Sequence, residues 1–131
     1  SKLQIPNSKL PTMQNKDFSK NLEERTKIFA IAIIRLSVLL PDTTEAWVIR
    51  KQVTRSGTSI GANYREANRA ISRPDFIHKI KICESEASET LYWLEIIDEM
   101  DWTEREQLQT IRSECDEILS IFTSIGKSLK R

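Results

Sequence analysis

The amino-acid sequence predicts an all-α protein, an antiparallel up-down-up-down four-helix bundle. Four long segments carry apolar residues every three or four positions, the spacing that places them on one face of a helix. Proline occurs only at positions 6, 11, 41 and 74, at the ends of these segments or before them. No segment shows the strict alternation of a half-buried strand, and short connections between long helices favour a bundle.

Length and composition are those of one soluble globular domain. The chain has 131 residues, of which 39% are hydrophobic and 30% are charged, which is enough for a single core. The best apolar run, residues 28–40, is interrupted by Arg35 and is too short to span a bilayer. No secretory signal opens the chain, and Cys83 and Cys115 occupy apolar helical positions typical of reduced core thiols. We therefore expect a cytoplasmic protein.

Both ends of the chain are predicted to lie outside the bundle. Residues 1–16 contain two prolines and no hydrophobic period, which predicts a flexible arm. We expect the natural start to be near Met13, just before the first periodic segment. The bundle is expected over residues 17–126, and residues 127–131 are expected to form a basic C-terminal tail.

The first helix is expected over residues 17–40, where Pro41 stops it. One apolar stripe follows the helical period and predicts the core face: Leu22, Phe29, Ile33, Leu36 and Leu40. A second apolar face consists of Ile28, Ile31, Ile34 and Val38. A helix that is apolar on two sides has two surfaces to bury, so the second face indicates an oligomer.

The second helix is expected from Asp42, with Glu45 as its capping-box partner, to about Arg69. It is basic and rich in small residues where an ordinary bundle helix is rich in leucine. Gly57 and Gly61 lie one turn apart within it. Since each interior glycine costs roughly 1 kcal/mol relative to alanine, this pair predicts a neighbouring helix packed closely against it.

The third and fourth helices carry the clearest apolar stripes. The third is expected to begin at Ser72, with Pro74 in its first turn, and its stripe consists of Phe76, Ile80, Cys83, Ala87, Leu91, Leu94 and Ile97. The fourth is expected to begin with a capping box at residues 103–106 and to end near Gly126. Its stripe consists of Leu108, Ile111, Cys115, Ile118, Phe122 and Ile125.

Charge is segregated along the chain, although the net charge is only +1. Residues 43–74 carry six basic and two acidic side chains, whereas residues 75–117 carry four basic and thirteen acidic ones. The cations of the second helix repeat at multiples of about one turn and would attract the phosphates of nucleic acid: Lys51, Arg55, Arg65 and Arg69.

The alternative for this basic surface is ion pairing between helices. The third helix carries several glutamates, among them Glu84, Glu86, Glu89 and Glu95. Charged helix faces are usually solvated or paired, so these carboxylates are expected to meet Arg50, Arg55, Arg65 and Arg69 rather than to perform acid–base catalysis.

Catalytic and metal-binding patterns are poorly supported. A di-iron centre in a bundle needs two Glu-x-x-His pairs, but the chain has one histidine, His78, whose only matching partner, Asp75, is expected to cap a helix. Ser56, Ser59 and Ser85 have no histidine near them in sequence. We therefore expect no catalytic residues, no metal and no cofactor, and a metal-dependent enzyme is the least favoured alternative.

Several strings of residues stand out together: Asn21-Leu22-Glu23-Glu24-Arg25, Phe29-Ala30, Leu39-Leu40-Pro41, Gln52-Val53-x-Arg55-Ser56-x-x-Ser59-Ile60-x-Ala62-Asn63-x-x-Glu66, Asp75-Phe76 and Glu86-Ala87-x-Glu89-Thr90-x-Tyr92-Trp93-Leu94. This pattern resembles one bacterial family, the four-helix bundle proteins encoded within intervening sequences of 23S ribosomal RNA genes. The resemblance covers about residues 18–122. Where the family often has glycine after the motif glutamate, this chain has Ala67, which indicates a longer second helix.

The resemblance implies a ring-shaped homopentamer with no established catalysis. It also implies that the motif residues serve helix packing or subunit interfaces: Arg55, Ser56, Ser59, Asn63, Glu66, Glu86, Glu89 and Trp93. The family is similar in fold to accessory proteins of diversity-generating retroelements, which are pentameric and bind nucleic acid and a reverse transcriptase through basic surface. We therefore expect a non-enzymatic oligomeric scaffold or adaptor for RNA, DNA or a nucleic-acid enzyme. The alternative is a purely structural oligomer.

Overall fold

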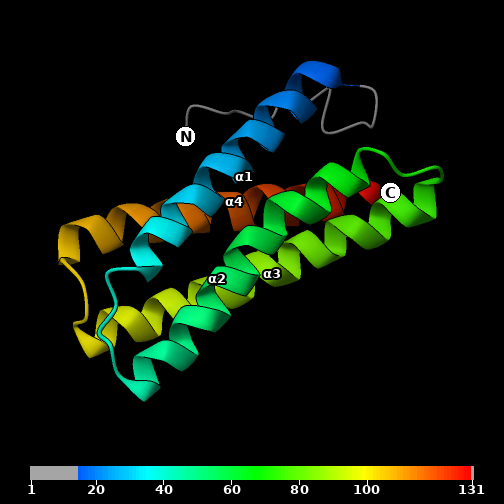
Figure 1. Cartoon of the computed structure of the whole chain (residues 1–131). Helices are drawn as coiled ribbons and strands as arrows, with labels where there is room; N and C mark the ends of the chain where they lie inside the picture. The colour runs from blue at the N-terminus through cyan, green and yellow to red at the C-terminus, as the bar shows by residue number, and fades with distance from the viewer. Residues whose placement is uncertain (1–14, 131) are drawn as a thin grey trace.

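The computed structural model describes residues 15–130, and these residues form four helices and no strands. Figure 1 shows how the helices are arranged. The helices are α1 (Lys16–Ser37), α2 (Thr44–Ala67), α3 (Arg73–Met100) and α4 (Arg105–Leu129). The all-α prediction is confirmed. The expectations for the arm before residue 15 and for Met13 lie outside the described residues, and Lys16, assigned to the arm, is the first residue of α1.

Helix α1 ends earlier than the sequence predicts. Its last residue is Ser37 rather than Leu40. The backbone N–H groups of Leu39 and Leu40 donate to carbonyl oxygens three residues earlier, at 3.0 and 3.3 Å, so residues 38–40 form turns. The residue before a proline is disfavoured in the helical region, and Pro41 therefore unwinds the chain before Leu40.

The N-terminal caps follow the prediction at α3 and differ at α2 and α4. Ser72 caps α3, its side chain accepting from a backbone N–H three residues later at 3.2 Å. Thr43 caps α2 in the same way at 3.1 Å, in the place expected for Asp42. The capping box expected at Thr103 does not form: Glu104 is the N-cap without a side-chain hydrogen bond, and the buried Thr103 hydroxyl has no partner within residues 15–130.

Helix α4 extends past Gly126, which corrects the predicted helix end and shortens the predicted tail. A glycine that ends a helix usually adopts a left-handed conformation, but Gly126 does not have a positive φ. The helix continues to Leu129. Ile125 and Leu129 are both buried, so the apolar stripe continues one turn further and keeps the backbone helical.

The core is built largely from the predicted stripes of α1, α3 and α4, of which Leu91 is only partly buried, together with buried residues of α2. Fully buried side chains come from all four helices and include Leu22, Phe29, Ile33, Ile60, Tyr64, Ile80, Leu94, Ile118 and Phe122. Across the centre, the rings of Tyr64 in α2 and Phe122 in α4 meet edge to face with their centroids 5.4 Å apart. Both cysteines are buried and unbonded to each other, as the sequence predicts.

Gly57 and Gly61 allow α1 and α2 to approach closely. A Cβ atom on Gly57 would lie 2.9 Å from two carbon atoms of the Ile33 side chain, and one on Gly61 would lie 3.0 Å from the Thr26 hydroxyl oxygen. Both distances are shorter than ordinary van der Waals contact. The close packing predicted for this glycine pair is confirmed, and α1 is the helix that fills the space.

Helix α2 packs against α1 on one side and α3 on the other, α3 also packs against α4, and α1 touches α4 much less. Figure 1 shows α1 running alongside α2 and overlapping α4 in this view, while α2 also lies beside α3. Because α1 is held mainly by α2, a large part of its surface faces away from the core.

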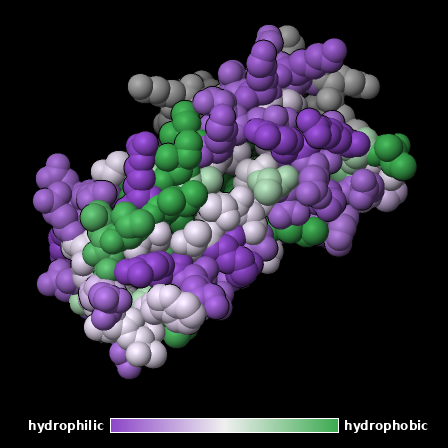
Figure 2. Space-filling view, in the orientation of Figure 1, coloured by the Kyte–Doolittle hydropathy of each residue, from purple (hydrophilic) through white to green (hydrophobic). Residues whose placement is uncertain are grey.

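The second apolar face of α1 is exposed. Ile28 is 58% exposed, Ile34 46% and Val38 69%, and Ile31 lies between them. Nearby apolar side chains extend this face onto the connection and the start of α2, namely Leu39, Trp47 and Val48. Figure 2 shows the resulting hydrophobic strip along the C-terminal half of α1. We call these seven residues the α1 apolar face. None of the described helices is both long and apolar enough to cross a membrane.

Candidate functional site

The four predicted nucleic-acid-binding cations do not form one continuous surface. The second helix ends at Ala67 rather than near Arg69, which corrects the expectation of a longer helix and places Arg69 in the turn after α2. Arg55 points toward α3, where it pairs with two glutamates. Arg65 points toward α1, with its Nε atom 3.7 Å from an oxygen of Glu23. The Lys51 ammonium lies over an indole ring, 4.6 Å from its centre. Arg69 makes no ion pair with another described residue. Two of the four cations, Arg55 and Arg65, are therefore already paired with carboxylates of the same chain.

Arg55 is the centre of a polar network between α2 and α3. Its guanidinium lies 3.3 Å from Glu86 and also contacts Glu89. The same Glu89 oxygen accepts a hydrogen bond from the Trp93 indole N–H at 2.9 Å. Hydrogen bonds from Arg55, and then from Trp93, lower the pKa of Glu89. The structure thus brings four of the predicted motif residues together, and they link two helices by ionic contacts.

Replacing Arg55 with glutamine is expected to lower the free energy of unfolding by less than about 1 kcal/mol, because Arg55 is 48% exposed and exposed ion pairs are weakened by water. The pKa of Glu89 is lowered in the folded state from its ordinary value of 4.5. The contribution is therefore complete above that value and is lost as the pH falls through the lowered pKa. Urea denaturation between about pH 7 and pH 3 should show the difference between wild type and Arg55→Gln shrinking in acid. A constant difference would contradict this role of Glu89.

Of the remaining motif residues, Ser56 and Glu66 link α2 to α3, whereas Ser59 and Asn63 bond within α2. The buried hydroxyl groups of Ser56 in α2 and Thr90 in α3 lie 2.8 Å apart in a hydrogen bond. Ser59 and Asn63 bond to carbonyl oxygens of their own helix, at 2.6 and 2.9 Å. Glu66 accepts from the Lys79 ammonium of α3 at 2.7 Å. These contacts support packing rather than a reactive centre.

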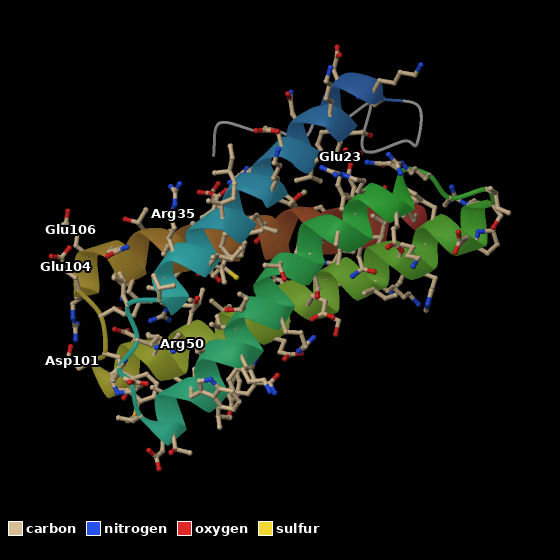
Figure 3. The ribbon with its side chains drawn as sticks, viewed as in Figure 1. Glu23, Arg35, Arg50, Asp101, Glu104 and Glu106 are labelled. Carbon is tan, nitrogen blue, oxygen red and sulfur yellow. The ribbon has the colours of Figure 1, made fainter. Side chains whose placement is uncertain are left out.

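Most of the ion pairs predicted between the basic second helix and the acidic third helix do not form, because the side chains contact other partners. Arg50 donates to the carbonyl oxygens of Ser37 and Leu40, at 2.9 and 2.7 Å, and so satisfies the end of α1 instead of a glutamate. Glu84 accepts from a threonine of α4, and Glu95 pairs with an arginine of α4. Figure 3 shows Arg50 directed at the end of α1. Only Arg55 meets the glutamates that were predicted for it.

Arg25 forms the principal polar link between α1 and α4, and sequence reasoning did not single it out. Its Nε donates to Glu114 at 2.7 Å, and its Nη2 donates to Glu114 at 2.9 Å and to Glu117 at 2.6 Å. The side chain is only 15% exposed. The hydrogen bonds that Arg25 donates to Glu114, followed by the one it donates to Glu117, raise the pKa of Arg25 despite its burial. The glutamates lie one turn apart on α4, but no pattern within α1 indicates which of its arginines faces them.

A groove of about 500 Å³ lies between α1 and α2, beside the N-terminal half of α1. Its floor is formed by small side chains, with Gly61 and Ala62 from α2 and Ala30 from α1. Lys27, Arg65 and Arg69 contribute the basic groups of its lining, so that two of the four predicted cations meet a lysine of α1 that the sequence analysis left out.

No group of three or more His, Cys, Asp or Glu side chains within residues 15–130 is arranged to hold a metal ion. His78 is exposed in the first turns of α3. The thiol groups of Cys83 and Cys115 lie 3.6 and 3.5 Å from the carbonyl oxygens of Ile60 and Ala87. Burial raises the pKa of both cysteines to about 12, so neither thiol is poised to act as a nucleophile.

The fold and these contacts define a class of protein: small four-helix bundles in which a hydroxyl-rich, glycine-containing α2 packs between α1 and α3. The 23S rRNA-intervening sequence protein family matches residues 20–124. The chain belongs to this family.

A solved structure from the S23 ribosomal protein family of Bacteroides thetaiotaomicron is similar to the chain. It shares 42% sequence identity with a TM-score of 0.75, over 81% of this chain and 98% of that one. That protein is described as having unknown function. A comparison with curated proteins gives no match.

Proposed function

We propose that this protein is a non-enzymatic scaffold that assembles into a homo-oligomer and binds nucleic acid through exposed cations. The observation that carries the proposal is the α1 apolar face. Contiguous exposed apolar surface on a small protein is typical of an interaction site. Four of its side chains, Ile28, Ile31, Ile34 and Val38, follow the helical period along α1, where Figure 2 shows a hydrophobic strip, so that one surface of a second copy can cover them together.

The energy available from this face is suited to assembly. Full burial of an aliphatic side chain contributes about 1.5–3 kcal/mol, and the members of the face are already about half covered, which leaves about 1 kcal/mol each. When the burial energies from both sides of one interface are added, the sum is comparable with the roughly 4–15 kcal/mol that association costs in lost translational and rotational freedom. A ring of five copies is the assembly that the family resemblance implies.

We also propose that neighbouring helices of the bundle run antiparallel, in up-down-up-down order, and contacts between the helices support this. Gly57 and the later Gly61 of α2 meet Ile33 and the earlier Thr26 of α1, so residue numbers rise along one helix as they fall along the other. The pairs between α2 and α3 and between α3 and α4 follow the same rule, as in Ser56 with Thr90, Glu66 with Lys79, Glu84 with Thr123, and Asp98 with Arg112.

Nucleic-acid binding is supported by the cations that internal contacts leave uncompensated. Lys51 and Arg69 make no ion pair with another described residue. The competing function is a purely structural oligomer whose charges are used internally. It is supported by the ion pairs of Arg55 and Arg65.

Introducing a charge into the α1 apolar face is expected to dissociate the oligomer. We expect wild type to have a mass in solution close to five times 15.2 kDa, and Ile34→Glu to have the mass of a single chain, because a buried, unpaired carboxylate strongly disfavours the interface. Light scattering at several protein concentrations measures both.

The matched control is Ile71→Glu. Ile71 is 98% exposed in the connection between α2 and α3, outside the α1 apolar face. The same change of residue there is expected to leave the mass of the oligomer unchanged. A monomeric wild type, or an Ile34→Glu variant as large as wild type, would refute assembly through this face.

A further inference from the structure

We infer that the groove between α1 and α2 binds the phosphodiester backbone of a nucleic acid, with Lys27, Arg65 and Arg69 as the groups that contact phosphate. This inference rests on the proposed nucleic-acid binding and names its site. It adds Lys27 of α1. It does not include Arg55, which is paired with Glu86 and Glu89, or Lys51, which is uncompensated but does not line the groove.

The charges around the groove favour an anion. Of its two carboxylates, Glu66 is paired with the Lys79 ammonium at 2.7 Å. Glu23 accepts from the Asn68 amide at 2.8 Å and lies 3.7 Å from Arg65. Figure 3 shows Glu23 directed into the space between α1 and the C-terminal end of α2. Both negative charges therefore have partners inside the chain.

The cations that line the groove are less engaged in ion pairs within the chain than its carboxylates are. Lys27 and Arg69 make no ion pair with any described residue. Arg65 is 53% exposed and its ion pair is long, so it can turn to a phosphate at small cost. Arg65 lies in the last turn of α2 and Arg69 in the turn that follows Ala67, and both line the groove. Lys27 lies on the opposite wall, so a strand in the groove meets cations on both sides.

The lining of the groove indicates that the ligand is recognised by its backbone rather than by its bases. Proteins that bind single strands through bases stack them on aromatic rings, and no residue that lines this groove is aromatic. The small side chains of the floor, Ala30, Gly61 and Ala62, let a chain lie close to the helices without offering hydrogen bonds to base edges. Binding is therefore expected to be salt-dependent and independent of sequence.

The test uses the full chain and fluorescence anisotropy with labelled oligouridylate and oligoadenylate. Wild type is expected to bind both equally and to lose about tenfold in affinity between roughly 50 and 200 mM salt. Lys27→Glu and Arg69→Glu are each expected to weaken binding by about tenfold. Each is also expected to lower the slope of log affinity against log salt concentration by the amount that about one phosphate contact contributes. Light scattering should show unchanged oligomer masses for both.

Lys81→Glu is the control for net charge, because Lys81 is exposed on α3 and lies away from the groove. It is expected to change affinity less than about twofold. An equal loss in Lys81→Glu would show a general charge effect and overturn the groove as the site.

Competition by uridine monophosphate at equal nucleotide concentration would overturn a backbone site in favour of a small-molecule site. Groove variants that bind like wild type would refute the groove alone, whereas a wild type that binds neither oligonucleotide would refute nucleic-acid binding as a whole.

Discussion

Gly57→Ala is expected to destabilise the fold by about 1–2 kcal/mol, although alanine is the better helix former. The new methyl group would lie 2.9 Å from the Ile33 side chain, which is fully buried, so the packed core around it would have to shift. Overpacking of this kind costs about 1–3 kcal/mol, and the gain in helix propensity of roughly 1 kcal/mol offsets only part of that cost. Urea denaturation, with α1 and α2 unfolding together, measures the difference.

The matched control is Gly126→Ala in α4. The nearest atom to a Cβ at this position is a Glu84 oxygen at 3.9 Å, an ordinary contact distance. The substitution adds helix propensity without a clash, so it is expected to stabilise the fold by up to about 1 kcal/mol. The prediction is thus a difference in sign between two identical substitutions. If Gly57→Ala stabilised the fold as much as Gly126→Ala, the close approach of α1 to α2 would be refuted.

Arg25→Ala is expected to destabilise the fold by about 2–4 kcal/mol. The change removes three charge-assisted hydrogen bonds and leaves Glu114 and Glu117 facing each other without their shared cation. Since α1 and α4 touch over little other surface, the loss is expected to fall on α1. Hydrogen exchange should show the amides of α1 losing protection before those of α2 and α3.

Arg65→Ala provides the comparison for this prediction. Arg65 also joins α1 to a neighbouring helix, but its ion pair is 3.7 Å long and its side chain is 53% exposed. Exposed pairs of this kind contribute at most about 1 kcal/mol. If the two variants were destabilised equally, the special contribution of the buried Arg25 contact would be disproved.

Hydrophobic period was sufficient to predict the four helices and their core faces. The apolar stripes of α1, α3 and α4 are largely buried as expected. Apolar residues at the helical period share one face of a helix, so the face that packs into the core can be identified from the sequence of that helix alone. Helix ends were less accurate. The end expected at Gly126 moved to Leu129 because the burial of a further apolar turn outweighed the glycine, and Thr43 replaced Asp42 as a cap.

The α1 apolar face was also evident from the sequence, because Ile28, Ile31, Ile34 and Val38 have no place in a single core stripe. The spacing of Gly57 and Gly61 similarly predicted a close helix contact, and the structure shows that α1 makes it. In these features the residues of one helix are enough, since an exposed apolar stripe or an interior glycine is visible without knowing its partner.

Ionic partners could not be obtained in this way. Whether Arg50 meets a glutamate or the end of α1, and whether Arg25 meets α4, depends on how far each helix is rotated and shifted against the next. The groove that joins Lys27 to Arg65 and Arg69 depends on the same two quantities. Period and composition specify which face of a helix is buried, but rotation and shift are set by the packing of all four helices at once. The chain's sequence therefore established its helices, core and apolar surface, while the pairing of its charges follows from the assembled bundle.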